Sequence, residues 1–116
     1  MSLYTYAARV ERVIDGDSLV VSIDLGLDVW RLHERIRLAH LNAPALSTPE
    51  GRAAKAFLAG LLGPLPQPVT LVTLKDRTEH YGRYLGVLTT ADGRTVNDAL
   101  LAAGHATPYE GHGKAS

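Results

Sequence analysis

Cysteine is absent from the 116 residues of the chain, which excludes disulfides, thiolate chemistry and cysteine-based zinc sites. Long hydrophobic runs are also missing, because no apolar stretch approaches the roughly 18–20 residues that span a bilayer. Residues 1–9 lack the basic region and the apolar core of a signal peptide. We therefore expect a soluble, cytoplasmic protein without a membrane partner. A signal sequence removed earlier stays the alternative.

An excess of charge of either sign is missing as well, since 12 basic residues balance 12 acidic ones. A protein that coats polyanions carries a basic surplus, so this balance argues against general nucleic-acid coating. It leaves room for a local site built from a few arginines. Nine of the 12 basic residues are Arg, which suits bidentate contacts with phosphate, although a GC-rich genome would give the same ratio.

An apolar content of 46% over 116 residues suits one globular domain. We expect a single domain over residues 4–110, a disordered tail over 111–116, and a monomer. Alternating, β-prone residues predict strands, with Asp15-Gly16-Asp17 as the turn between the first two. The expected strands span residues 4–14, 18–24, 29–39, 69–75 and 83–90.

Two helices interrupt and follow these strands. The first begins near Ser47 and Glu50, which have the spacing of a capping box. The second is expected over residues 96–103, between the N-cap residue type Thr95 and the terminating Gly104.

The order of elements predicts a fold that is mainly β with helices (α+β). We expect a five-stranded OB-type Greek-key barrel, with one helix between strands three and four and one C-terminal helix. The rival is an open α+β sheet packed on two helices.

Three short segments carry the chemical signal, and each of them alone is weak. They are Val13–Leu19 (VIDGDSL), Arg35–Pro44 (RIRLAHLNAP), and Tyr81–Leu85 (YGRYL) followed by Asp92-Gly93 and Val96-Asn97. In this order and at these spacings they resemble the staphylococcal (micrococcal) nuclease family, over residues 6–106. The stretch 24–38 is most similar to the phage and bacterial branch of that family.

The resemblance implies a Ca²⁺-dependent phosphodiesterase acting on DNA or RNA, with single strands expected. In such enzymes two Asp side chains and a backbone carbonyl hold the metal, a Glu serves as the general base, and two Arg residues hold the phosphate. This fits the physics, because Ca²⁺ prefers oxygen ligands and guanidinium groups stabilise charge on the reacting phosphate.

Carried over by position, the resemblance gives each residue an expected role. Asp17 matches the first metal ligand, and the backbone carbonyl of Ala43 matches another. Arg37 and Arg83 match the two phosphate-binding arginines. The expected nucleotide contacts are Tyr81 and, near the chain end, Tyr109. Asp15 is a candidate outer partner of the metal, with a role in the turn as the alternative.

Two positions depart from the family pattern. Asn42 stands where the second metal carboxylate is expected, so one negative charge is lost. Ala45 stands at the position of the general base, which is therefore vacant. Losing a positioned base costs on the order of 10²–10⁴ in rate. We expect Glu50 to cap a helix rather than to replace the base.

The sequence therefore leaves open whether the chain is an enzyme. We expect a nuclease-like domain that binds nucleic-acid phosphate, binds Ca²⁺ weakly or not at all, and has lost most or all hydrolysis. A slow Ca²⁺-dependent nuclease and a protein-interaction module on a retired nuclease fold are the alternatives.

Overall fold

The computed structural model describes residues 4–78 and 84–109, and over 75–78 it describes the backbone alone. Five strands close into a barrel in the order β1-β2-β3-β6-β5. Barrel neighbours are antiparallel except β3 and β6, which run parallel. This is the predicted OB-type arrangement, and the fold prediction is confirmed. The strands are β1 (Thr5–Asp15), β2 (Ser18–Asp24), β3 (Trp30–Leu38), β5 (Gln67–Thr78) and β6 (Tyr84–Thr90).

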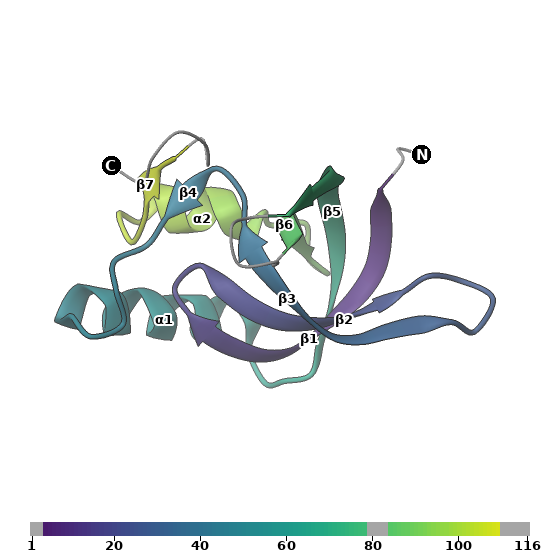
Figure 1. Cartoon of the computed structure of the whole chain (residues 1–116). Coiled ribbons are helices and arrows are strands. Elements are labelled where there is room, and N and C mark those ends of the chain that lie inside the picture. The colour runs from purple at the N-terminus through teal and green to yellow at the C-terminus, as the bar shows by residue number, and fades with distance from the viewer. Residues whose placement is uncertain (1–3, 79–83, 110–116) are drawn as a thin grey trace.

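The two expected helices are present (Figure 1). Along the chain, the first precedes the last two barrel strands and the second follows them. Helix α1 (Pro49–Leu62) follows β3 and packs on β1, whereas α2 (Val96–Ala102) follows β6 and packs on it. Beyond α2, Gly104 has a φ of +80°. The Gly104 and His105 amides donate back to the last turn, to Leu101 O and Leu100 O, which is the Schellman arrangement that Gly permits.

The core fills the barrel and both ends of it. Leu19, Val21 and Ile23 of β2 belong to the apolar cluster inside the barrel, and the residues between them, Ser18, Val20 and Ser22, are buried as well. Leu58 from α1 and Leu100 from α2 join the same apolar cluster. The helices therefore close the barrel and fix the loops that follow β3 and β6.

The sequence analysis did not predict two short strands. Strand β4 (Leu41–Asn42) pairs antiparallel with β7 (Thr107–Pro108) in a separate two-stranded sheet. Two residues are too few to show a period, so only the tertiary fold reveals this pairing.

The predicted capping box of Ser47 with Glu50 is wrong by one position. Thr48 is the N-cap of α1, and its Oγ1 accepts from the Gly51 amide at 2.9 Å. Pro49 then takes the first helical position, where its missing N–H costs nothing. Glu50 is exposed in the first turn, where its charge suits the helix dipole.

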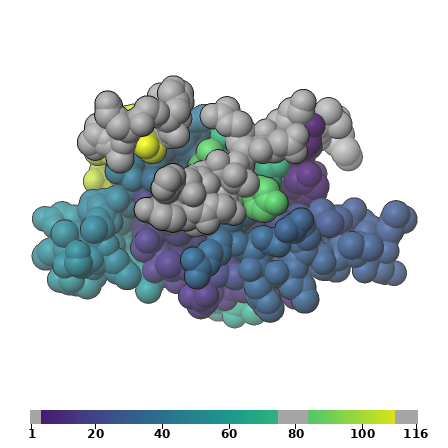
Figure 2. All heavy atoms as spheres, viewed as in Figure 1, coloured from purple at the N-terminus to yellow at the C-terminus, as the bar shows by residue number. Residues whose placement is uncertain are grey.

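The hairpin of β2 and β3 extends away from the barrel, to the right in Figures 1 and 2. Beyond the barrel, β3 leaves its neighbour β6, which pairs only with Ile36–Leu38. In the described part of the chain no helix is long and apolar enough to cross a membrane. The expected tail over 111–116 lies outside the described residues.

Candidate functional site

The turn between β1 and β2 meets the start of α1 and the segment after β4. A Cβ built on Gly16 would lie 2.7 Å from the Ala54 Cβ and 2.9 Å from the Ala43 Cβ. Real Cβ atoms do not approach so closely, so only glycine fits here. This close approach places Asp17 against residues 42–43, two segments more than twenty positions apart in the sequence.

Asp17 is buried at this junction, with 8% of its surface exposed. Its Oδ2 accepts from the Ala43 amide at 2.9 Å, and its Oδ1 accepts from the Ser18 hydroxyl at 3.3 Å. The Asp17 amide donates to Asp15 Oδ1 at 3.1 Å. Asp15 therefore holds the turn, which is the alternative role weighed for it.

Arg37 reaches the same carboxylate from β3. Its Nη1 lies 3.2 Å from Asp17 Oδ2, and the exposed fractions of the two side chains are 12% and 11%. Nη1 also donates to Leu41 O at 3.0 Å and to Leu38 O at 3.3 Å. The guanidinium is thus fixed by the chain segment that carries Asn42.

Asn42 completes this arrangement, because its Oδ1 accepts from Arg37 Nη2 at 2.8 Å. Its carbonyl oxygen accepts from the Thr107 hydroxyl at 3.4 Å, on the β7 side. Asn42, which departs from the family pattern, is thus a direct partner of Arg37, which matches it.

Burial raises the pKa of Asp17, and the Asp15 carboxyl beside it acts in the same direction. The Ala43 amide and the Arg37 cation oppose this rise. Burial has the largest effect, so the Asp17 charge is held at a cost that a nearby cation offsets only in part.

Position 45, where the general base was expected, carries an exposed methyl group. The Ala45 carbonyl accepts from the Thr48 amide at 2.9 Å and from its hydroxyl at 2.7 Å. A Cβ on Gly51 would lie 1.9 Å from that carbonyl oxygen. The backbone at Ala45 is therefore pinned to the start of α1, while its side chain offers no proton acceptor.

The resemblance implies Ca²⁺ here, and the donors present do not fit it. Calcium takes roughly six to eight oxygen ligands and favours charged ones, whereas of the two carboxylate positions in the family motif only Asp17 is an acid and Asn42 is neutral. Both Asp17 and Asn42 already bind the Arg37 cation. A divalent ion between those oxygens would meet the guanidinium at close range, and like charges repel.

The remaining predicted site residues are not brought to this junction by anything that the structure describes. Arg83 and Tyr81 lie outside the described residues. Tyr109 follows β7, and its amide donates to His40 O at 3.0 Å. Its role as a nucleotide contact stays a prediction.

Sequence reasoning did not assign a role to Asn97, which turns out to hold the site in place. This side chain of α2 is 4% exposed. Its Oδ1 accepts from the Leu88 amide at 3.1 Å, and its Nδ2 donates to Ala39 O at 3.0 Å and to Gly86 O at 3.2 Å. The sequence signal for this role was a polar Asn next to Val96 on the apolar side of a short helix, because a buried Asn needs hydrogen-bond partners.

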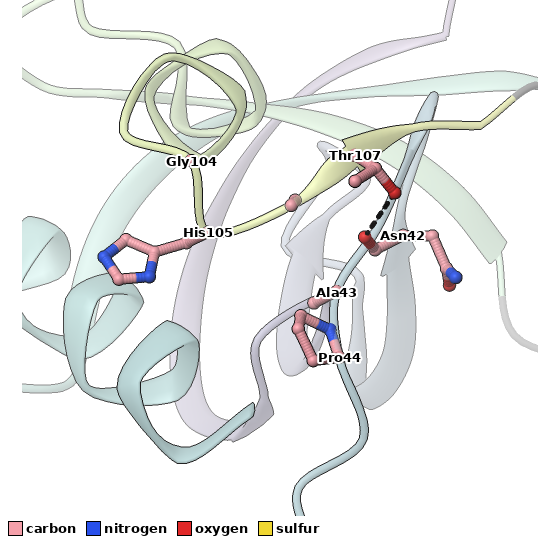
Figure 3. Close-up of a pocket in the computed structure, with 7 residues that line it drawn as sticks. Asn42, Ala43, Pro44, Gly104, His105 and Thr107 are labelled. Atoms are coloured by element: carbon pink, nitrogen blue, oxygen red, sulfur yellow. Dashed lines mark hydrogen bonds between the residues drawn. The ribbon is translucent and has the colours of Figure 1, made fainter. Parts of the chain in front are cut away.

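A pocket of about 180 Å³ lies between the end of β4 and the segment that follows α2. It is lined by Asn42, Ala43, Pro44, Gly104, His105, Ala106 and Thr107. Figure 3 shows His105 on one side and the Asn42 side chain pointing away from it. The pocket adjoins the junction of Asp17 and Arg37, because Asn42 and Ala43 line the pocket and also bind Arg37 and Asp17.

Comparison with known proteins gives a consistent result. A family model described as staphylococcal nuclease homologue matches residues 35–116. A protein of Escherichia coli named Uncharacterized endonuclease is 35% identical over 102 residues, which cover 88% of this chain and 60% of the relative. Protein ParB of Escherichia coli is 33% identical over 116 residues, which cover 93% of this chain and 60% of the relative.

Endonuclease YhcR of Bacillus subtilis (strain 168) is 30% identical over 116 residues, which cover 90% of this chain and 9% of the relative. The chain thus spans 60% of the length of the Escherichia coli relatives. The similarity concerns a shared domain.

Proposed function

Since the chain belongs to the staphylococcal nuclease family, we propose that it binds nucleic-acid phosphate and that its Ca²⁺-dependent hydrolysis is lost or strongly impaired. One observation carries this proposal. The Arg37 guanidinium lies between the Asp17 carboxylate and the Asn42 amide, where a metal-dependent enzyme needs free oxygen ligands.

Phosphate binding follows from the way in which Arg37 is held. Its contacts with two backbone carbonyls and Asn42 fix the guanidinium before any ligand arrives. A fixed guanidinium loses little conformational entropy on binding. Its Nη1 is taken up by Asp17 and two carbonyls, so we propose that Nε and the second hydrogen of Nη2 bind the phosphate oxygens. Arg83 is proposed as the second phosphate contact and Tyr81 as a nucleotide contact, by their positions in the family motif.

Impaired hydrolysis follows from Ala45 and Asn42 together. The Ala45 methyl cannot accept a proton from water, and the loss of a positioned base costs about 10²–10⁴ in rate. Asn42 provides no charge to hold a cation beside Asp17. Because both residues serve one assembly, their effects need not multiply.

The partner is proposed to be single-stranded DNA or RNA, and the working form a monomer in the cytoplasm. A protein that contacts phosphates releases counterions from the nucleic acid, and this release contributes less binding free energy as the salt concentration rises. Binding of a labelled oligonucleotide is therefore expected to weaken steeply with added salt. A protein that binds no oligonucleotide at low salt would contradict the proposal.

A repair experiment tests the catalytic half. Asn42→Asp together with Ala45→Glu is expected to raise Ca²⁺-dependent cleavage of denatured DNA by at least about 10²-fold. The two single variants are the matched controls, and each is expected to recover less than the pair. A correctly folded double variant without activity would show that the site has been misassigned.

A slow nuclease is the second candidate, favoured by the retained Asp17 and Arg37. Incubation of the unmodified chain with Ca²⁺ and with chelator distinguishes it. More cleavage with Ca²⁺ than with chelator would support slow catalysis, and equal background in both would end it.

A further inference from the structure

The outer face of β1, β2 and β3 carries an arginine-rich surface that starts at the site. The strand register sets it out in rows. Ser18 pairs with Arg37, and the next outward row joins Arg12, Val20 and Arg35. The row beyond contains Arg9 beside Ser22.

The far end of this face carries the single tryptophan of the chain. Trp30 pairs with Asp24 on β2, on the same outward side. Trp30 is 40% exposed, and the Arg9 guanidinium carbon lies 4.9 Å from the centre of its ring. We name Arg9, Arg12, Arg35, Arg37 and Trp30 the outer face.

The charge of this face is not fully cancelled. Arg37 pairs with Asp17, and Arg9 pairs with Glu11 at 2.7 Å. Among the described residues no ion pair involves Arg12 or Arg35, and both side chains are exposed. Asp15 and Asp24 are the other acids on this side, and each holds a turn amide. Two exposed arginines thus stand between the site and Trp30, in the row next to Arg37.

We infer that the outer face binds a single nucleic-acid strand leaving the site, with Arg12 and Arg35 on its phosphates and Trp30 stacked on a base. The inference rests on the proposed function and extends it to a defined path. Arg37 and Trp30 are seven residues apart along β3, which is about 20 Å in a strand. A strand of several nucleotides covers such a length, and OB folds bind roughly 4–16 nucleotides.

The tryptophan indicates a single strand rather than a duplex. A base in a duplex is already stacked on its neighbours, whereas an unpaired base offers its ring to an aromatic side chain. Arg9 covers part of the indole and polarises it by a cation–π contact. The base would use the exposed part.

A second copy of the chain is the competing occupant, because the hairpin also exposes Leu25, Leu27, Val29 and Leu32. The free edge of β3 is poorly suited to pair with another strand. His33 has a φ of +59°, and its amide is bonded to the Ser22 hydroxyl at 3.2 Å. Such a bulge interrupts the ladder that edge pairing needs.

Trp30 is itself the probe for the test, since no other tryptophan contributes to the fluorescence. We would titrate the protein with a thymidine dinucleotide and with an oligothymidylate of about 12 residues, in chelator and at low salt. A fluorescent label on each oligonucleotide reports total binding by anisotropy. The longer ligand is expected to quench Trp30, and the dinucleotide is expected to bind without quenching.

Variants separate stacking from charge. Trp30→Ala is expected to weaken binding of the longer oligonucleotide about 5- to 150-fold, from the usual strength of base stacking. Its affinity for the dinucleotide is expected to stay unchanged. Trp30→Phe should retain most of the affinity. Arg12→Gln and Arg35→Gln should each reduce the slope of the logarithm of the binding constant against the logarithm of the salt concentration by about 0.7. Arg94→Gln, at an exposed turn elsewhere, is the matched control and should not change it.

The possible outcomes separate the proposed path from the proposed phosphate binding. Circular dichroism must show that the wild type and Trp30→Ala are both folded. If the longer oligonucleotide then binds equally to both, the proposed path to Trp30 is overturned, and phosphate binding at the site is left in place. No binding of either ligand would overturn both. A change in Trp30 fluorescence with protein concentration, together with dimers in sedimentation and no response to oligonucleotide, would assign the face to a second copy.

Discussion

Asn97 allows a quantitative test of how the fold supports the site. Asn97→Ala removes the partner of the Leu88 amide and of Ala39 O, both held by a side chain that is 4% exposed. Gly86 O keeps a second donor, the Ala39 amide at 2.8 Å. Of the three backbone groups that lose an Asn97 bond, the Leu88 amide and Ala39 O are therefore the two that we count as a cost, at about 1–3 kcal/mol each.

The expected loss is about 2–6 kcal/mol, a large part of the roughly 5–15 kcal/mol that stabilises a domain. At about 4 °C for each kcal/mol in a domain of this size, the melting temperature should fall by about 8–24 °C. Urea unfolding followed by far-ultraviolet circular dichroism measures the free energy, and calorimetry measures the melting temperature.

Two further variants sharpen this test. Asn97→Asp keeps an acceptor for the Leu88 amide but replaces Nδ2, which donates both other bonds, by one oxygen atom, so it should be at least as unstable as Asn97→Ala. Asp98→Asn, on the exposed side of the same helix, should cost less than about 1 kcal/mol. If Asn97→Ala unfolded at the wild-type urea concentration, the three hydrogen bonds would not support the fold, and the reasoning would be refuted.

Three other changes have definite expectations. Thr48→Ala should cost about 1 kcal/mol as the loss of an N-cap, whereas Ser47→Ala should be neutral; equal effects in urea unfolding would restore the capping box first predicted. Gly51→Ala should cost about 1–3 kcal/mol or more, because its Cβ would meet Ala45 O at 1.9 Å; an unchanged melting temperature would contradict that contact. Burial raises the folded-state pKa of Asp17, so the stability of the wild type relative to Asp17→Asn should fall as the pH rises from about 4 to 7. A pH-independent difference in unfolding free energy would show that Asp17 titrates as it does in the unfolded chain.

Much of the fold could be read from local patterns. The alternation of Leu19, Val21 and Ile23 identified β2 with its bounds, since period two is a property of a strand alone. Gly104 was identified as the terminator of α2 for a similarly local reason, its tolerance of positive φ. The N-cap at Thr48 was missed because Ser47 and Thr48 offer the same hydroxyl, and only backbone geometry decides between them.

The sequence by itself determined the chemical inventory of the site. It showed Asp17 and Arg37 present, a neutral amide at Asn42 and a methyl at Ala45, because these are properties of residue types. Only the tertiary structure decided how they are used. The contact between the turn at Gly16 and residues 42–43 brings Arg37 onto both Asp17 and Asn42. Pairing across a barrel depends on strand register and close packing, which no local pattern encodes.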